Sequence, residues 1–107
     1  MSLDVYLEGE DGMAAWEANV THNLNKMADA AGIYEILWRP EEVAIVRALD
    51  LIEKLEAGIA AMKADPAKFK AFNPKNGWGD YDGFVRWCEE YLAACRNFPW
   101  AKVRASR

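Results

Sequence analysis

Apolar and polar residues alternate at both ends of the chain. Residues 3–8 and 14–20 alternate with a period of two, and residues 9–12 between them have the composition of a tight turn. This alternation is typical of strands with one buried face, so the two segments predict a β-hairpin. Residues 101–107 alternate small or apolar with basic side chains and predict a closing strand that pairs with the hairpin. A lone hairpin is marginal in water, so a third strand and packed helices are needed.

Helical spacing of apolar residues dominates the segment between these strands. Thr21 is a suitable N-cap for a first helix that ends at Gly32. A second helix of about 23 residues is expected to open at Pro40, whose acidic neighbours suit a first turn. Asp80 or Asp82 is expected to cap the last helix. The apolar stripe expected on the second helix is Ile45, Leu49, Ile52, Leu55, Ile59 and Met62.

Length and composition agree with one domain over residues 1–107. Apolar residues make up 52% and charged residues 28%, as in globular proteins. We therefore predict an α+β fold in which a three-stranded antiparallel sheet, formed by the N-terminal hairpin and the C-terminal strand, packs against about three helices. No apolar run approaches the ~20 residues of a membrane span, and the N-terminus lacks the pattern of a signal peptide. We expect a cytoplasmic protein with no membrane partner.

The cysteines and the single histidine give no sign of a metal or disulfide. Cys88 and Cys95 fall in the last predicted helix, where they would lie about 10 Å apart, beyond the ~7 Å that a disulfide allows. Two free, buried thiols are expected. With one histidine and no close cysteine pair, we expect neither a zinc site nor a cofactor.

Charge is unevenly distributed along the chain. The 13 basic and 17 acidic residues leave a net charge of −4, which argues against general nucleic-acid binding. Residues 1–62 are strongly acidic, whereas residues 63–107 are net basic. This asymmetry could guide an anionic ligand or pair two copies of the chain. Alternatively, acids and bases of the two halves are simply neighbours in one fold.

The first candidate binding segment is the junction of the second strand and the first helix. This segment is residues 19–23, in which Asn19, Thr21, His22 and Asn23 are polar, and free amides at a helix start favour anions. His22 is the only histidine, hence the natural general acid or base if there is one. The alternative is that Thr21 caps the helix and His22 is half-buried with a satisfied hydrogen bond.

The second candidate segment combines aromatic rings with charged side chains, namely Tyr34, Glu35, Trp38 and Arg39. An aromatic ring beside an arginine can stack a planar ligand and contact its phosphate. The alternative is that Trp38 fills the core and Arg39 pairs with Glu41 or Glu42.

The third candidate segment is the glycine-rich loop 73–83. Lys75, Asn76, Trp78 and Tyr81 add charge, hydrogen-bonding groups and stacking surface, and loops of this length are often functional. The loop lacks the arrangement of a P-loop. The alternative is a rigid loop in which Trp78 closes the edge of the core.

Four sequence blocks resemble a family of small uncharacterised proteins from bacteriophages and bacterial genomes. These blocks are N-V-T-H-N-L (19–24), A-G-I-Y-E (31–35), L-W-R-P (37–40) and F-N-P-K-N-G-W-G (72–79). The resemblance covers nearly the whole chain and implies a phage context within a bacterial host cell, without an established activity. By analogy, small phage proteins often counter host defence, either by sequestering a nucleotide signal or by docking on a defence protein.

These signs favour a non-enzymatic binding protein for a small anionic, nucleotide-like ligand. Aromatic side chains would stack a base, while cations and amides would hold phosphate. A homodimer or higher oligomer with the pocket near the interface is expected, because a small chain offers little cavity. Two alternatives stay open, namely a protein-binding inhibitor that uses the acidic half of the chain, and a small hydrolase or transferase that uses His22.

Overall fold

The computed structural model describes residues 2–107 and confirms the predicted sheet. Strands β1 (Ser2–Glu8), β2 (Ala14–Thr21) and β3 (Lys102–Ser106) are antiparallel and lie in the order β2-β1-β3. The alternation seen in the sequence separates the two faces of β1. Leu3, Val5 and Leu7 are fully buried on the face that the helices cover, whereas the intervening residues are only partly buried.

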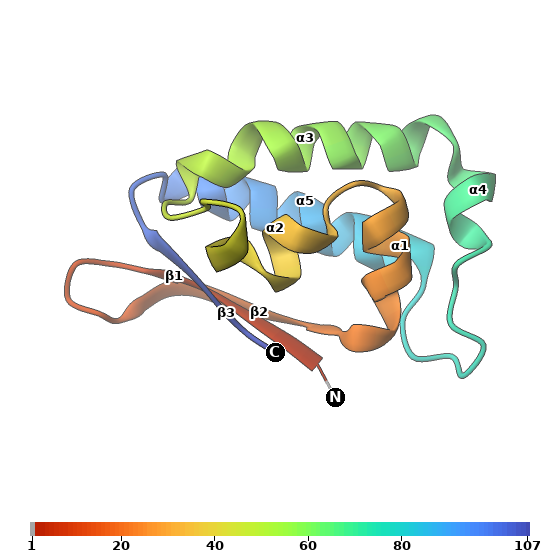
Figure 1. The fold of residues 1–107 in the computed structure, drawn as a ribbon, viewed down its shortest axis with the longest axis horizontal. Coiled ribbons are helices and arrows are strands. Elements are labelled where there is room, and N and C mark those ends of the chain that lie inside the picture. Colours follow the sequence, from red (N-terminus) through yellow and green to blue (C-terminus); the bar gives the residue numbers. More distant parts are fainter. Residues whose placement is uncertain (1) are drawn as a thin grey trace.

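Five α-helices lie on one side of the sheet, and of these α2 and α5 contact its strands (Figure 1). They are α1 (Asn25–Ala30), α2 (Tyr34–Trp38), α3 (Leu49–Ala64), α4 (Pro66–Lys70) and α5 (Tyr81–Asn97), with short 3-10 helices η1 (His22–Leu24) and η2 (Pro40–Glu42). The long helices α3 and α5 pack against each other, and α5 also contacts β2. In the part of the chain that the structure describes, no helix has the length and apolar character needed to cross a bilayer.

Both predicted helix caps are present. The Thr21 hydroxyl accepts a hydrogen bond from the Asn23 amide at 3.3 Å, and an Asp80 carboxylate oxygen accepts one from the Gly83 amide at 2.7 Å. Each side chain satisfies a backbone N–H that has no partner within its helix. The start of α5 and the turn from β2 into η1 are therefore determined by local sequence.

The predicted 23-residue helix that opens at Pro40 is wrong. Its first turn is the 3-10 helix η2, and α3 begins only after residues 43–48. Ala44 has a left-handed backbone with φ of 59°, which ends any helix. The Val46 carbonyl then accepts a hydrogen bond from the Val103 amide at 2.9 Å. Bonds to the C-terminal strand thus replace the intrahelical bonds that the sequence pattern suggested.

The core is apolar and holds both cysteines as free thiols. Cys88 and Cys95 are buried and unpaired, as predicted. Burial raises the pKa of Cys95 to about 12 and raises that of Cys88 further. Both thiols stay protonated near neutral pH and cannot act as nucleophiles.

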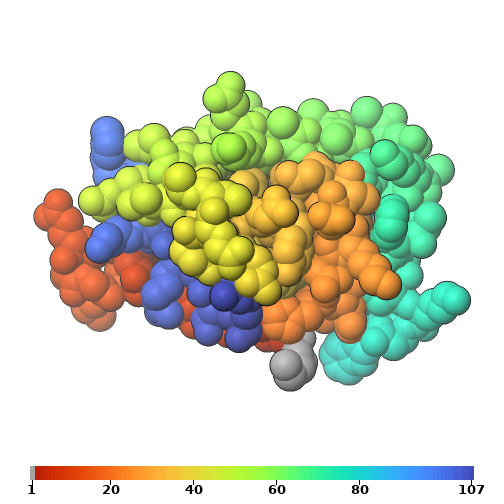
Figure 2. Space-filling view, viewed as in Figure 1, coloured from red at the N-terminus to blue at the C-terminus, as the bar shows by residue number. Residues whose placement is uncertain are grey.

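Ion pairs join the acidic first half of the chain to its basic second half. Glu8 pairs with Arg104 at 3.0 Å, and Glu56 pairs with Arg96 at 2.9 Å. A third pair joins Glu41 to Arg107 at 2.6 Å. Figure 2 shows the C-terminal strand, in blue, against the yellow segment that carries Glu41. Acids and bases of the two halves are neighbours, which is the simpler of the explanations for the charge asymmetry.

Helix α3 approaches the α1–α2 turn closely at Gly58. A Cβ atom at this position would overlap Cγ2 of Ile33, which is buried. Inside a helix, Gly→Ala normally stabilises by about 1 kcal/mol. We expect Gly58→Ala instead to lower the free energy of unfolding by about 1–3 kcal/mol because of this overlap. Urea denaturation measures the change.

An Ile33→Ala background provides the control for this prediction. Removing the Ile33 side chain makes room for the new methyl group, so the added cost of Gly58→Ala should vanish there. An equal cost in both backgrounds would contradict the contact as its cause.

Candidate functional site

A cleft of about 810 Å³ separates η1 and α1 from the loop that follows α4. Its walls are His22, Asn23, Asn25 and Lys26 on one side and residues 71–76 on the other. A second hollow of about 460 Å³ shares His22 and Asn23 with the first and extends to Trp78. We call the two together the loop cleft. Figure 2 shows the loop, in turquoise, beside the orange segment of η1 and α1.

The loop is held in place by its own asparagines and by a close approach to β2. The Asn73 side-chain oxygen accepts from the Tyr81 amide at 2.8 Å, and that of Asn76 accepts from the Trp78 amide at 3.0 Å. Gly79 has φ of +96°, and a Cβ atom there would lie only 2.8 Å from Cγ2 of Thr21. Glycine is required for both reasons, so the loop packs directly on the end of β2.

His22 is oriented by a buried tryptophan. Trp38 Nε1 donates a hydrogen bond to His22 Nδ1 at 2.8 Å. The Trp38 ring is only 2% exposed and stacks on Tyr34, with ring centroids 5.5 Å apart. Because Nδ1 accepts, the proton of the neutral imidazole is assigned to Nε2. The imidazole therefore has a fixed orientation and its second nitrogen is a donor.

Six of the ten predicted binding residues line the loop cleft. They are Thr21, His22, Asn23, Lys75, Asn76 and Trp78. The structure thus brings together the first and third candidate segments, which are about fifty residues apart in the chain. Trp78 is 70% exposed, so it does not close the edge of the core.

Trp38 and Tyr81, which we predicted as stacking residues, belong to the core. Trp38 is held by His22 and Tyr34 as described above. Tyr81 is 6% exposed, and its hydroxyl donates to the Met62 carbonyl oxygen at 2.7 Å. Neither ring has a free face for a ligand, and this corrects the prediction that either could stack a base.

Tyr34 and Arg39 lie outside the loop cleft. Arg39 Nε donates to the Tyr34 hydroxyl at 3.4 Å, and the guanidinium pairs with Glu42 at 2.9 Å. The hydrogen bond to Tyr34 and then that to Glu42 raise the pKa of Arg39. The arginine forms the surface pair that we considered as the alternative, which corrects its placement in a binding site.

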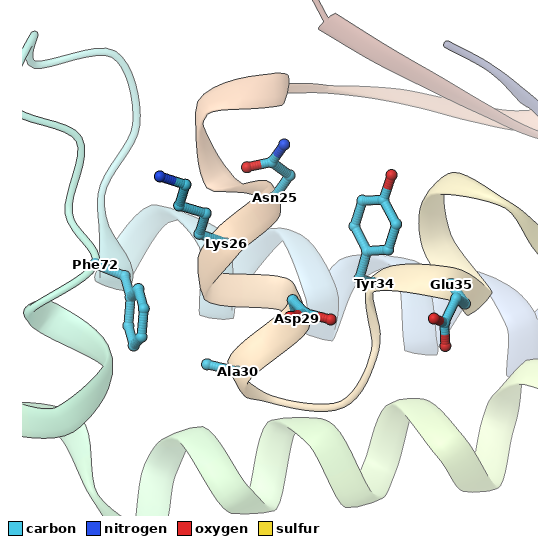
Figure 3. A pocket seen from close by; sticks show the side chains of 7 residues that line it. All are labelled: Asn25, Lys26, Asp29, Ala30, Tyr34, Glu35 and Phe72. Atoms are coloured by element: carbon cyan, nitrogen blue, oxygen red, sulfur yellow. The ribbon is translucent and has the colours of Figure 1, made fainter.

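A neighbouring hollow of about 500 Å³ shares Asn25, Lys26 and Phe72 with the loop cleft (Figure 3). Lys26 and Phe72 line its side toward the loop, and Tyr34 lines the opposite side. Asp29 and Glu35 also border it, so this hollow is acidic where the loop cleft is basic. An anion is therefore better placed on the His22 side of Lys26.

Sequence reasoning missed Ser2, Asn25 and Lys26, which are polar residues of the loop cleft outside the candidate segments. Asn19 and Asn73 lie within the first and third candidate segments but were not named as binding residues. Lys26 could have been found, since it follows His22 by four positions and such pairs lie on one helix face. By contrast, the expected anion-binding amides are less available than predicted. The Asn23 amide is bonded to Thr21, and α1 is a short helix with little dipole.

Comparison with family models, with curated proteins and with solved structures gives no match. The resemblance to small phage proteins therefore stays a prediction. Across residues 2–107, no group of three or more histidine, cysteine or acidic side chains is arranged to hold a metal ion. The function has to be argued from the chemistry of the loop cleft.

Proposed function

We propose that the protein binds a small anionic, nucleotide-like ligand in the loop cleft. The observation that carries the proposal is an excess of hydrogen-bond donors. His22, Asn73 and Asn76 each have an acceptor atom engaged within the protein, by Trp38, Tyr81 and Trp78 respectively. What they can offer a ligand is the imidazole Nε2–H and two amide NH₂ groups.

Two lysines add positive charge to these donors. Lys26 lies on α1 and Lys75 on the loop, and both border the cleft. Neither forms an ion pair with any residue from 2 to 107. A set of donors and cations with engaged acceptors suits a ligand rich in acceptor oxygens, such as a phosphate group.

The Trp78 end of the loop cleft has a different chemistry. Trp78 offers an exposed indole ring, which is a stacking surface for a base. The Asn19 amide nitrogen donates to Ser2 Oγ at 2.8 Å and to Asp4 Oδ1 at 2.6 Å, which leaves the Asn19 oxygen as an acceptor. We therefore place the base at this end, with an amino or imino N–H toward Asn19, and the phosphate between Lys26 and Lys75.

Binding without catalysis is favoured over a hydrolase or transferase. In a Ser–His–Asp arrangement a carboxylate holds the histidine nitrogen opposite the catalytic one. At His22 an indole N–H of Trp38 occupies that position. The cysteine thiols are protonated and buried in the core, so they supply no nucleophile either.

A thermal-shift titration tests the proposed function. Mono-, di- and cyclic nucleotides are added at millimolar concentration, and a bound ligand raises the melting temperature by mass action. The double variant Lys26→Gln/Lys75→Gln should weaken binding about tenfold or more, as expected for loss of charge-assisted hydrogen bonds. Added salt should weaken wild-type binding more than binding to this variant.

Lys54→Gln is the matched control, because Lys54 is an exposed residue of α3 that does not border the loop cleft. It removes a positive charge without touching the site and should leave the affinity unchanged. If none of the nucleotides changes the melting temperature, or if the control weakens binding as much as the double variant, the proposal is wrong.

A further inference from the structure

Strand β2 forms one edge of the sheet, and its outward backbone groups are unused. The pairing of β1 with β2 is regular from Ser2↔Thr21 to Leu7↔Trp16, and a bulge follows at Ala15. In residues 16–20, no backbone group forms a hydrogen bond outside the ladder with β1, within the described chain. An edge strand of this kind presents a row of free N–H and C=O groups that can pair with another strand.

The opposite edge of the sheet is partly closed. The Val103 amide donates to the Val46 carbonyl at 2.9 Å, and Arg47 forms a bridge to Lys102. On β2, by contrast, residues 16–21 contain no proline and no lysine, which are the residues that commonly block an edge. A single carboxylate, that of Glu17, interrupts an otherwise uncharged run.

The apolar layer beside this edge is incompletely covered. Trp16 of β2 and Trp87 of α5 are both half-buried and both pack on Tyr91, with ring centroids 5.2 Å and 5.5 Å away. The Trp87 indole nitrogen is buried and has no hydrogen-bond partner within residues 2–107. Aromatic side chains of the core are therefore partly exposed at this edge of the sheet.

We propose that a second copy of this chain pairs its β2 antiparallel with this edge, so that two three-stranded sheets join into one. The helices of both copies lie on the same face of the joined sheet only if helix-facing residues of one β2 oppose helix-facing residues of the other. The two copies are related by a two-fold axis that passes between the same residue of each β2. If that residue is Glu17, two carboxylates oppose each other. If it is Trp16, the bulge enters the ladder. A two-fold axis at Ala18 pairs only residues 16–20, all of which lie in the regularly paired part of β2.

The register centred on Ala18 is self-complementary. Trp16 of each copy then opposes Val20 of the other on the helix-covered face, which extends the apolar layer. On the outer face Glu17 of each copy opposes Asn19 of the other, so no two carboxylates face each other. Two small alanine side chains meet at the axis, where they allow close approach of the backbones. This match of apolar and small side chains, without facing carboxylates, favours a second copy over an unrelated strand.

The mass of the full chain in solution tests the proposal, by analytical ultracentrifugation over a range of concentrations. Wild-type protein should reach twice the 12.1 kDa of one chain. Asn19→Lys places a lysine opposite Glu17 of the second copy and should keep or tighten the dimer. Glu17→Lys/Asn19→Lys places lysines opposite each other and should raise the dissociation constant about tenfold.

Glu53→Lys is the matched control, since Glu53 is exposed on α3 and the substitution makes the same change of charge as Glu17→Lys. Its dissociation constant should equal that of wild type. Amide hydrogen exchange should also show outward amides of residues 16–20 protected only at concentrations where the dimer forms. A wild-type chain that stays monomeric at millimolar concentration, or a dimer that is indifferent to both lysine variants, would overturn the proposal.

Discussion

Replacing Trp78 with alanine is expected to weaken nucleotide binding ten- to hundredfold. Stacking of one base on an aromatic side chain contributes about 1–3 kcal/mol, and Trp78 offers the exposed ring of the loop cleft. The melting temperature of the free protein should stay close to that of wild type, because a side chain that is 70% exposed contributes little to the core. Calorimetric titration of wild type and variant measures the change in affinity.

Trp100 provides the matched control for this experiment. It is 74% exposed, like Trp78, but it lies between α5 and β3 and does not line the loop cleft. Trp100→Ala should leave nucleotide affinity unchanged. If both alanine variants bind as tightly as wild type, the base does not stack on Trp78, and the proposed orientation of the ligand is wrong.

Replacing Trp38 with alanine is expected to lower the free energy of unfolding by about 3–5 kcal/mol. This is the usual cost of emptying the space of a buried aromatic ring, and it is a large share of the 5–15 kcal/mol that typically stabilises a domain. The Trp38 ring is 2% exposed, stacks on Tyr34 and donates a hydrogen bond to His22. Urea denaturation followed by circular dichroism measures the loss.

Trp38→Phe separates packing from hydrogen bonding at the same position. Phenylalanine retains an aromatic ring, so its cost should be clearly smaller than that of alanine, while the donor to His22 Nδ1 is lost. The released imidazole can then turn its acceptor nitrogen toward the cleft, and nucleotide affinity should fall although the fold persists. Equal stability losses for the two variants would contradict the packing role assigned to Trp38.

Sequence patterns were sufficient to predict those features that depend on interactions between residues close together in the chain. The period-two alternation of residues 3–8 identified β1, because one face of a strand is buried whatever packs on it. Thr21 and Asp80 were identified as caps because a capping side chain bonds to an amide only two or three residues away. The cysteines were expected to stay unpaired because helical geometry alone separates them.

The candidate site was predictable only in part. Residues 19–23 and the loop 73–83 were chosen for their side-chain chemistry, and the structure brings them to one cleft. Their meeting depends on Gly79, which lets the loop approach Thr21. The donor character of the cleft depends on which acceptor atoms the fold engages, and composition carries no information on that.

Tertiary structure decided which backbone groups pair and which side chains are buried, because segments far apart in the chain compete for these positions. Residues 43–48 have the apolar spacing of a helix, yet Val46 bonds to Val103 of the C-terminal strand instead. Trp38 and Trp78 are the same residue type, but one fills the core and the other faces solvent. By itself the sequence determined which segments are strands and where the capped helices η1 and α5 begin, because neighbours along the chain set those choices. Which tryptophan is buried, and which backbone groups pair, depended on contacts that exist only after the sheet and the helical layer have come together.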